Sequence, residues 1–507
     1  MTPKSDLYDL VKSLTEKEVK AFKAEIMKRQ GDHVYLKVFD ILHGMESFDE
    51  EKAKAQFQGT KTLNNFSIAK SNLYDRLLEV LCELPHHQSI ETEFDRYRQQ
   101  ITILVKKSLH KQAMARVNRA VKLAEKLEAY RKLLDLHDIQ REIARNFLPP
   151  EEYLDLLRVL RNKEAWVKEL EQNLQRYRDL FDTASIAQKV PMNIRMTMVN
   201  SILTHQLLQD ESECRSITAK LYFFRTWNHL YSIQGRDTGW KYFAQRIIEI
   251  LEENEFLMAD PGKLLVYINT ITELGLHSIA FNEYASAMEA AEKLKTIRKN
   301  LKTGDSEALL FSRYWKLQLV YAQKRLDEKN GLVAVESIKE GLRRFKEKLS
   351  KTDNMELRHI TGAFLLTVDR NSEAIPWILS LRDGKLESSR PDLHFYSWIL
   401  FLVAHYSLGH LDVVEQQIPG TIHYLREHKA MTPFMRLVTQ FFKKAGGIRN
   451  RKEELVLLEK TRTELQSLLE NSNDLSVLEL FDILDWFSSR IAGVPITRLP
   501  RTVAQEP

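Results

Sequence analysis

Hydrophobic residues recur three and four positions apart along most of the chain, with polar residues between them. Over residues 68–84, for example, leucine occupies positions 73, 77, 78, 81 and 84. This spacing places the leucines on one face of an amphipathic helix. Two capping-box pairs, Thr15 with Glu18 and Ser47 with Glu50, mark helix starts in the same part of the chain. The pattern predicts an all-α protein with no central strand.

The stretch from His394 to Leu425 predicts two helices joined by a tight turn. A hairpin of this kind cannot bury its apolar face alone, so it must stack on neighbouring hairpins. The positions that define the first helix, the turn and the second helix are, in that order, Trp398, Phe401, Leu402 and His405; Leu408, Gly409 and His410; and Val414, Ile418 and Thr421.

Similar hairpins are predicted on both sides of this stretch. If a small residue early in the second helix is taken as the marker, the intervals between markers are 40, 54, 40, 40 and 40 residues. A regular period predicts an array of stacked hairpins. A longer helix through residues 293–299 and a loop over residues 300–305 account for the one long interval. The markers are Trp240, Ala280, Ala334, Ala374, Val414 and Glu454; Trp240 and Glu454 break the small-residue rule, so the prediction rests on the four between them.

The Trp398, Leu408-Gly409 and Val414 offsets resemble the template of tetratricopeptide repeats. This resemblance implies a right-handed α-solenoid of stacked antiparallel helix hairpins, whose first helices line a groove. Two N-terminal phrases, Leu7–Lys23 (LYDLVKSLTEKEVKAFK) and Phe66–Val80 (FSIAKSNLYDRLLEV), resemble the opening of a group of bacterial helical-repeat proteins without an assigned function. That second resemblance implies helical-repeat architecture and no activity.

These elements divide the sequence into five predicted segments. Residues 1–88 are an N-terminal helical cluster, and residues 89–220 are long helical hairpins that include the first irregular repeats. Residues 221–474 are the repeat array. Residues 475–492 are a C-terminal capping helix, with its pattern running from Leu475 to Ile491, and residues 493–507 are a flexible tail.

Composition agrees with a large helical protein of the cell interior. A chain of 507 residues exceeds the size at which one core keeps growing, and only 17 Gly and 13 Pro interrupt it. Cys82 and Cys214 lie far apart in apolar helical patterns, which favours free thiols in a reducing compartment. The charged N-terminus lacks a signal-peptide pattern, and the longest apolar run, residues 398–404, is far shorter than the roughly 20 residues of a membrane span. We expect a soluble cytoplasmic protein.

The motifs of common enzymes are missing from the sequence. It contains no Gly-x-Gly-x-x-Gly, no Gly-x-Ser-x-Gly and no His-Glu-x-x-His. The Gly262-Lys263 dipeptide lacks the first glycine of a phosphate-binding loop, because Leu257 stands at that position. His86 and His87 form the only histidine pair, and they are interpreted as loop histidines and not as metal ligands. We therefore predict a protein that is not an enzyme and that holds no cofactor and no metal.

The groove of the predicted array is the candidate binding site. Its expected occupant is a protein or peptide of acidic character, because four of the nine groove positions carry a fixed positive charge. The aromatic stretch over residues 222–243 is interpreted mainly as packing between repeats. The predicted groove residues are Tyr222, Arg225, His229, Asn269, Lys316, Gln323, His359, Arg436 and Lys443.

A regulator that binds nucleic acid is the alternative hypothesis. Residues 67–84 carry the small and polar side chains of a recognition helix, at Ala69, Lys70, Ser71 and Asn72. Residues 1–90, however, hold 13 basic and 14 acidic side chains, which disfavours DNA binding by that module. Residues 95–132 hold eleven basic and three acidic side chains. This stretch is interpreted either as a solvated helix face or as a phosphate-binding patch. The patch residues are Lys111, Arg116, Arg119, Lys122 and Lys126.

Overall fold

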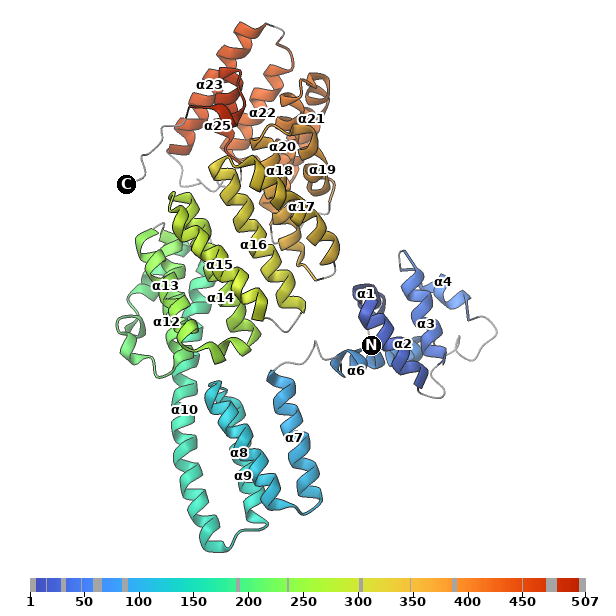
Figure 1. Cartoon of the computed structure of the whole chain (residues 1–507), viewed down its shortest axis with the longest axis vertical. Helices are drawn as coiled ribbons and strands as arrows, with labels where there is room; N and C mark the ends of the chain where they lie inside the picture. Colours follow the sequence, from blue (N-terminus) through green and yellow to red (C-terminus); the bar gives the residue numbers. More distant parts are fainter. Residues whose placement is uncertain are drawn as a thin grey trace. The chain divides into compact units, whose positions relative to one another are not determined.

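The computed structural model describes residues 6–14, 16–28, 33–46, 48–57, 66–83, 90–187, 192–234, 237–300, 304–346, 348–384, 390–448, 450–470 and 481–500. Over these residues the regular structure consists of 23 α-helices and short 3-10 turns, without a strand (Figure 1). The all-α prediction is therefore confirmed. No helix in the described part of the chain combines the length and the apolar character that crossing a membrane requires.

The contacts divide the chain into two compact units, residues 1–270 and residues 271–507. The division falls inside α14 (Pro261–Ala280), whereas the sequence placed a boundary near residue 220, which lies inside α12 (Ile217–Gln234). The physical reason is α10 (Pro150–Ala187), which packs both against α9 (Tyr130–Arg145) and against α12. This helix joins the segments before and after residue 220 into one unit.

The first five helices share a core of their own within the first unit. They are α1 (Asp6–Ser13), α2 (Glu16–Lys28), α3 (His33–Gly44), α4 (Glu50–Ala55) and α6 (Phe66–Glu83). Their buried apolar side chains, among them Phe22, Phe39 and Leu73, all belong to residues 7–80.

The rest of the first unit consists of helices that pack on their neighbours in sequence. Helix α7 (Ile90–Lys106) packs on α8 (His110–Lys126), α8 on α9, α10 on α11 (Met192–Leu203), and α12 on α13 (Asp237–Glu253). Cys214 is a buried free thiol in the loop before α12, and burial raises its pKa to about 11. The side chain of Cys82 lies outside the described residues.

The second unit is a series of helices that contact one another in order. After α14 these are α15 (Tyr284–Asn300), α16 (Gly304–Arg325), α17 (Glu328–Arg344), α18 (Lys351–Thr367), α19 (Asn371–Arg382), α20 (Pro391–Ser407), α21 (Leu411–Glu427), α22 (Pro433–Ala445), α23 (Arg451–Glu470) and α25 (Ile483–Ala492). The first helices of successive pairs also contact each other, α16 with α18, α18 with α20, and α20 with α22.

One turn geometry recurs at the hairpins of both units. In five of them a single residue with left-handed backbone conformation stands two positions before the second helix: Ser108, Asn282, Leu326, Asp369 and Gly409. The fifth residue after each of these is buried, which gives the series Ala113, Ala287, Gly331, Ala374 and Val414. These five hairpins therefore share a turn conformation and a buried position at the same offset.

This register corrects the sequence-based markers. Ala280 is the exposed last residue of α14, and Ala287 on α15 is the buried equivalent of Ala374. On α17 the residue that corresponds to Ala374 is Gly331, three positions before the marker Ala334. Between residues 287, 331, 374 and 414 the intervals are 44, 43 and 40, so the constant period of 40 holds only at the C-terminal end.

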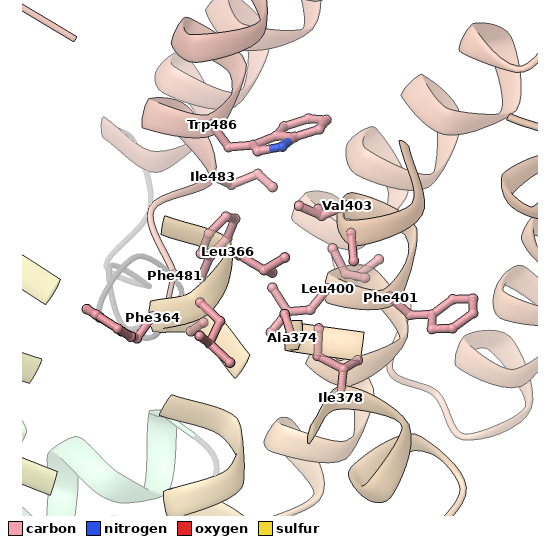
Figure 2. Packing of buried hydrophobic residues seen from close by; sticks show 14 of the residues in the cluster. Phe364, Leu366, Ala374, Ile378, Leu400, Phe401, Val403, Phe481, Ile483 and Trp486 are labelled. Carbon is pink, nitrogen blue, oxygen red and sulfur yellow. The ribbon is translucent and has the colours of Figure 1, made fainter. Parts of the chain in front are cut away.

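Buried apolar side chains between Ala308 and Ile496 form one core in the second unit. Ala374 and Ile378 of α19 pack there with Leu400 and Val403 of α20, as Figure 2 shows. Trp398 stacks on Tyr424 of α21, with ring centroids 4.7 Å apart, at the edge of the same helices. The hairpin predicted over residues 394–425 is therefore present as α20 and α21.

The C-terminal end of the described chain is packed. Trp486 of α25 is buried, and its indole N–H donates to the Ser407 hydroxyl over 2.9 Å. Asp482 caps α25, so the helix begins later than the predicted Leu475, which lies outside the described residues. Ile496, placed in the predicted flexible tail, is only 4% exposed, and residues 501–507 lie outside the described part.

Candidate functional site

A charged cleft in the first unit begins at the turn between α8 and α9. Glu128 adopts a left-handed conformation there, with a φ of 55°. Its carboxylate accepts the backbone N–H groups of Ile217 (2.8 Å) and Thr218 (2.7 Å) at the start of α12. Free amides at a helix N-terminus favour a negative partner. Glu128 therefore fixes the α8–α9 turn to α12.

The cleft itself has a volume of about 300 Å³ between α7, α9 and α10. Two ion pairs span it, from Arg131 Nε to Glu171 (2.6 Å) and from Lys132 Nζ to Glu91 (2.7 Å). Tyr130 lies on its inner wall, where burial raises the pKa of the phenol to about 12. The lining residues are Glu91, Glu128, Ala129, Tyr130, Arg131, Lys132, Glu171, Leu174, Gln175 and Arg178.

Each acidic side chain of this lining has a partner in the protein. Glu91 binds Lys132, Glu171 binds Arg131, and Glu128 binds the start of α12. The guanidinium of Arg178 instead donates to the Gln175 amide oxygen (3.3 Å), and no carboxylate of the described residues lies within 4 Å of it. The cleft therefore has a cation without an acidic partner.

Lys263 is a second cation near the cleft, although it is not one of the lining residues, and the charge of Asp260 acts on it. It lies at the start of α14, near enough to Glu128 and Arg178 for their charges to act on it. Burial lowers the pKa of its ammonium group, and the described residues offer no carboxylate within 4 Å. Burial penalises the charged form of a lysine. A bound anion would relieve this cost and would raise the pKa of Lys263.

Beside the cleft, aromatic rings and arginines form a layer between α10 and α12. The Arg225 guanidinium lies 4.0 Å from the centroid of the Phe181 ring and 5.2 Å from that of Tyr222. Arg178 lies 5.7 Å from the Tyr222 centroid on the other side. His229 packs on Phe181, and burial lowers its pKa. Arg178, which lines the cleft, is therefore also in contact with this aromatic layer.

The structure therefore brings three of the predicted groove residues together on one helix. Tyr222, Arg225 and His229 share one face of α12, while Asn269 is half buried on α14 of the same unit. The other five belong to the second unit. Arg436 and Lys443 are exposed on α22, whereas His359 is only 1% exposed and thus part of the core.

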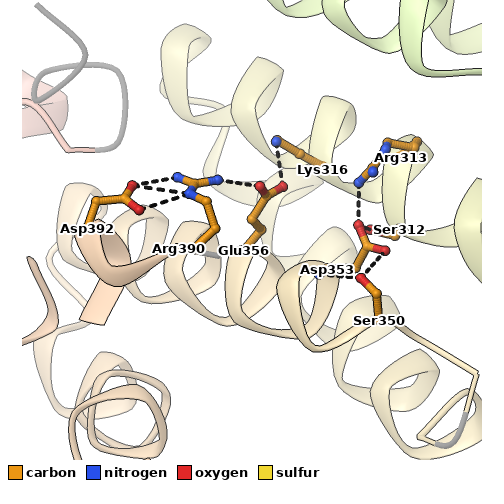
Figure 3. Close-up of polar contacts among 8 residues, drawn as sticks. All are labelled: Ser312, Arg313, Lys316, Ser350, Asp353, Glu356, Arg390 and Asp392. Carbon is orange, nitrogen blue, oxygen red and sulfur yellow. Dashed lines mark hydrogen bonds and ion pairs between the residues drawn. The ribbon is translucent and has the colours of Figure 1, made fainter. Parts of the chain in front are cut away.

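Lys316 and Gln323 connect helices of the second unit. Lys316 of α16 pairs with Glu356 of α18 over 2.7 Å, and Gln323 donates to the Thr367 hydroxyl over 3.3 Å. Glu356 also pairs with Arg390, as Figure 3 shows. The charge of Lys316 is therefore neutralised between helices instead of facing a ligand.

The basic patch predicted on α8 is a surface feature. Lys111, Arg119, Lys122 and Lys126 are exposed, and Arg116 is half buried. By contrast, Lys70 of the predicted recognition helix pairs with Glu50 over 3.1 Å. The aromatic stretch over residues 222–243 packs α12 on α13, for example through Trp227 stacked on Phe243. His86 and His87 lie outside the described residues, and those that are described contain no cluster of three or more potential metal ligands.

Sequence reasoning missed Glu128, Arg178 and Lys263. They come from three helical segments far apart in the chain, so no local spacing relates them. Lys263 was noticed only as part of a Gly-Lys dipeptide. Comparisons with protein-family models, with curated proteins and with solved structures found no match for this chain.

Proposed function

We propose that this chain is a non-enzymatic binding protein, a right-handed tetratricopeptide-like α-solenoid whose first-unit cleft takes an acidic segment of a partner protein. The observation that carries the proposal is the charge balance of the cleft. Its three carboxylates are engaged within the protein, while Arg178 of the lining and Lys263 beside it have no carboxylate within 4 Å among the described residues. An anionic group supplies what this arrangement lacks.

A peptide fits the site better than a small free anion. The cleft of about 300 Å³ holds one or two side chains, and Gln175 adds an amide for hydrogen bonding. The adjoining layer of Phe181, Tyr222 and Arg225 offers apolar contact to the residues that flank a bound carboxylate. Charged pairing within the cleft and aromatic contact beside it are the two components of many peptide sites.

The test uses the full-length chain and a fluorescein-labelled hexaglutamate peptide, with hexaglutamine as the neutral probe. Fluorescence anisotropy at low salt is expected to show hexaglutamate binding that the double variant R178Q/K263Q weakens at least tenfold. Each charge-assisted hydrogen bond contributes about 1.5–3 kcal/mol. The matched control is R436Q/K443Q, which removes two exposed charges from α22.

Equal binding of hexaglutamine, or undiminished binding by R178Q/K263Q, would overturn the proposal. A loss of binding in R436Q/K443Q alone would instead place the acidic segment on α22. Circular dichroism of each variant checks that the helices remain folded.

A further inference from the structure

The α7–α8 hairpin carries the excess positive charge of the chain. Residues 96–126 contain nine Lys or Arg and one acidic residue, Glu125. This segment therefore contributes a net +8 to a chain whose total is +5, so all the other residues together sum to −3. A concentration of positive charge of this kind attracts polyanions. In this chain the excess positive charge belongs to this one hairpin.

The exposed cations of α8 lie on one side of the helix. At about 100° per residue, Lys111, Arg119, Lys122 and Lys126 fall within an arc of about 80°. The opposite side holds the buried Ala113, Val117 and Ala120. We call the four cations the basic face of α8; Arg116 lies at its margin. The face is about 22 Å long, from the helical rise of 1.5 Å per residue.

These cations lack the partners that cations of the neighbouring helix have. On α9, Arg131, Lys132 and Arg141 each pair with a carboxylate. No described carboxylate lies within 4 Å of any cation of the basic face, and Lys126 contacts the Phe256 ring at 5.3 Å. Four like charges close together repel one another. An external polyanion would remove that repulsion.

We propose that the basic face of α8 binds the phosphate backbone of duplex nucleic acid without reading its sequence. Duplex DNA presents a phosphate about every 3.4 Å along each strand, so a face of this length meets several of them. The arc carries no aromatic side chain that could stack on the bases of a single strand. Its largest apolar residue is Ala115, so it has nothing to insert into a bilayer.

The experiment measures binding of the full chain to a fluorescent 20-base-pair DNA of mixed sequence at three salt concentrations. The slope of log K against log salt is expected to be about −3.6, which corresponds to four neutralised phosphates. In the variant K111Q/R119Q/K122Q the slope falls to about −1, and affinity at the lowest salt drops at least tenfold. A second duplex of unrelated sequence binds equally.

The control variant K329Q/R343Q/K346Q removes the same charge from exposed positions of the second unit. Its DNA binding should equal that of the wild type. Equal losses in both triple variants, or none in the α8 variant, would overturn the proposal. So would tighter binding of the single strand, or of vesicles containing phosphatidylserine, than of the duplex.

This inference is independent of the acidic-peptide site. R178Q/K263Q should keep its affinity for the duplex, and K111Q/R119Q/K122Q should weaken hexaglutamate binding far less than R178Q/K263Q does. If one variant abolished both activities, a single basic surface would be responsible, and the assignment of two sites would be wrong.

Discussion

Gly331 and Gly420 both lie inside helices of the second unit, but in opposite surroundings. A Cβ atom on Gly331 of α17 would stand 1.9 Å from the tip of the Phe364 ring, which is fully buried. A Cβ on Gly420 of α21 would meet nothing within 4 Å. The first glycine is therefore required by packing between α17 and α18, and the second is not.

Substitution of these glycines by alanine should change stability in opposite directions. In a helix interior alanine is more favourable than glycine by up to about 1 kcal/mol. G420A should therefore stabilise the second unit by about 0.5–1 kcal/mol. In G331A the overpacking against Phe364 outweighs this gain, with a net cost of about 1–3 kcal/mol. Thermal unfolding followed by circular dichroism compares the two. Stabilisation by G331A would show that Phe364 moves freely, contrary to its burial.

His359 is a buried base in the core of the second unit. Neither ring nitrogen has a hydrogen-bond partner among the described residues, and burial together with the charge of Arg390 lowers its pKa to about 4. The folded chain therefore keeps this imidazole neutral, whereas the unfolded chain protonates it below a pH of about 6.5. Folding stability from this group is complete above that pH and is lost as the pH falls toward 4.

The variant H359L should reduce the acid sensitivity of the second unit. In the wild type, protonation of His359 in the unfolded chain lowers the free energy of unfolding by about 1.4 kcal/mol per pH unit below 6.5, or about 2 kcal/mol at pH 5, and H359L removes this loss. Urea unfolding midpoints at pH 7.5 and pH 5 measure the difference. H423L removes an exposed imidazole of α21 and is the matched control for the substitution itself. An equal pH dependence of H359L and the wild type would contradict this interpretation.

At the scale of elements, the helices of the second unit are joined by charge as well as by apolar packing. Glu356 of α18 binds Lys316 of α16 and Arg390 at the start of α20 (Figure 3). Arg390 binds Asp392 as well, over 2.7 Å. The Glu356 side chain is only 12% exposed, so water screens these pairs poorly.

Removal of the Glu356 charge should therefore loosen three helices together. E356Q leaves a half-buried lysine with no carboxylate, which should cost about 1–3 kcal/mol. The control E373Q breaks the exposed Arg370–Glu373 pair of α19 and should cost less than about 0.5 kcal/mol. Urea unfolding of both variants decides between them. A similar small effect in both would mean that the Figure 3 pairs contribute to specificity and not to stability.

The helices were predictable from sequence because their apolar spacing is strong, but the turns between them were not. Among the described residues, Gly409 is the only glycine with a left-handed conformation that precedes a second helix; the others include Ser108, Leu326 and Asp369. Serine, aspartate and asparagine are common in turns but also occur at many other positions of this chain, and leucine has no turn preference, so none of them marks a turn as clearly as glycine does. The register was therefore correct around Gly409 and was misplaced at Ala280, where Asn282 makes the turn.

The candidate site was predictable only in part, for a related reason. Tyr222, Arg225 and His229 lie three and four positions apart on one helix, so local periodicity places them together. Arg178 and Lys263 approach the same region from α10 and α14 through packing between distant segments. No local pattern encodes that approach, and pairing of Lys316 with Glu356 is equally invisible to it.

At the scale of the whole molecule, two hypotheses place nucleic acid on different parts of the chain. The predicted recognition helix belongs to the cluster α1–α6, whose core comes entirely from residues 7–80. Residues 1–90 have a net charge of −1, and Lys70 pairs with Glu50. The basic face of α8, by contrast, lies in a segment of net positive charge, and its cations have no carboxylate within 4 Å among the described residues.

A chain that starts at residue 89 separates these hypotheses. Because the α1–α6 core is self-contained, the remaining helices should stay folded by circular dichroism. Duplex affinity and its salt slope should match those of the full chain, since phosphate-driven binding depends on the number of cations that contact the backbone, and all four cations of the basic face remain. A loss of duplex binding in a folded truncated chain would assign nucleic acid to the N-terminal cluster and would leave the unpaired charge of α8 as a solvated surface.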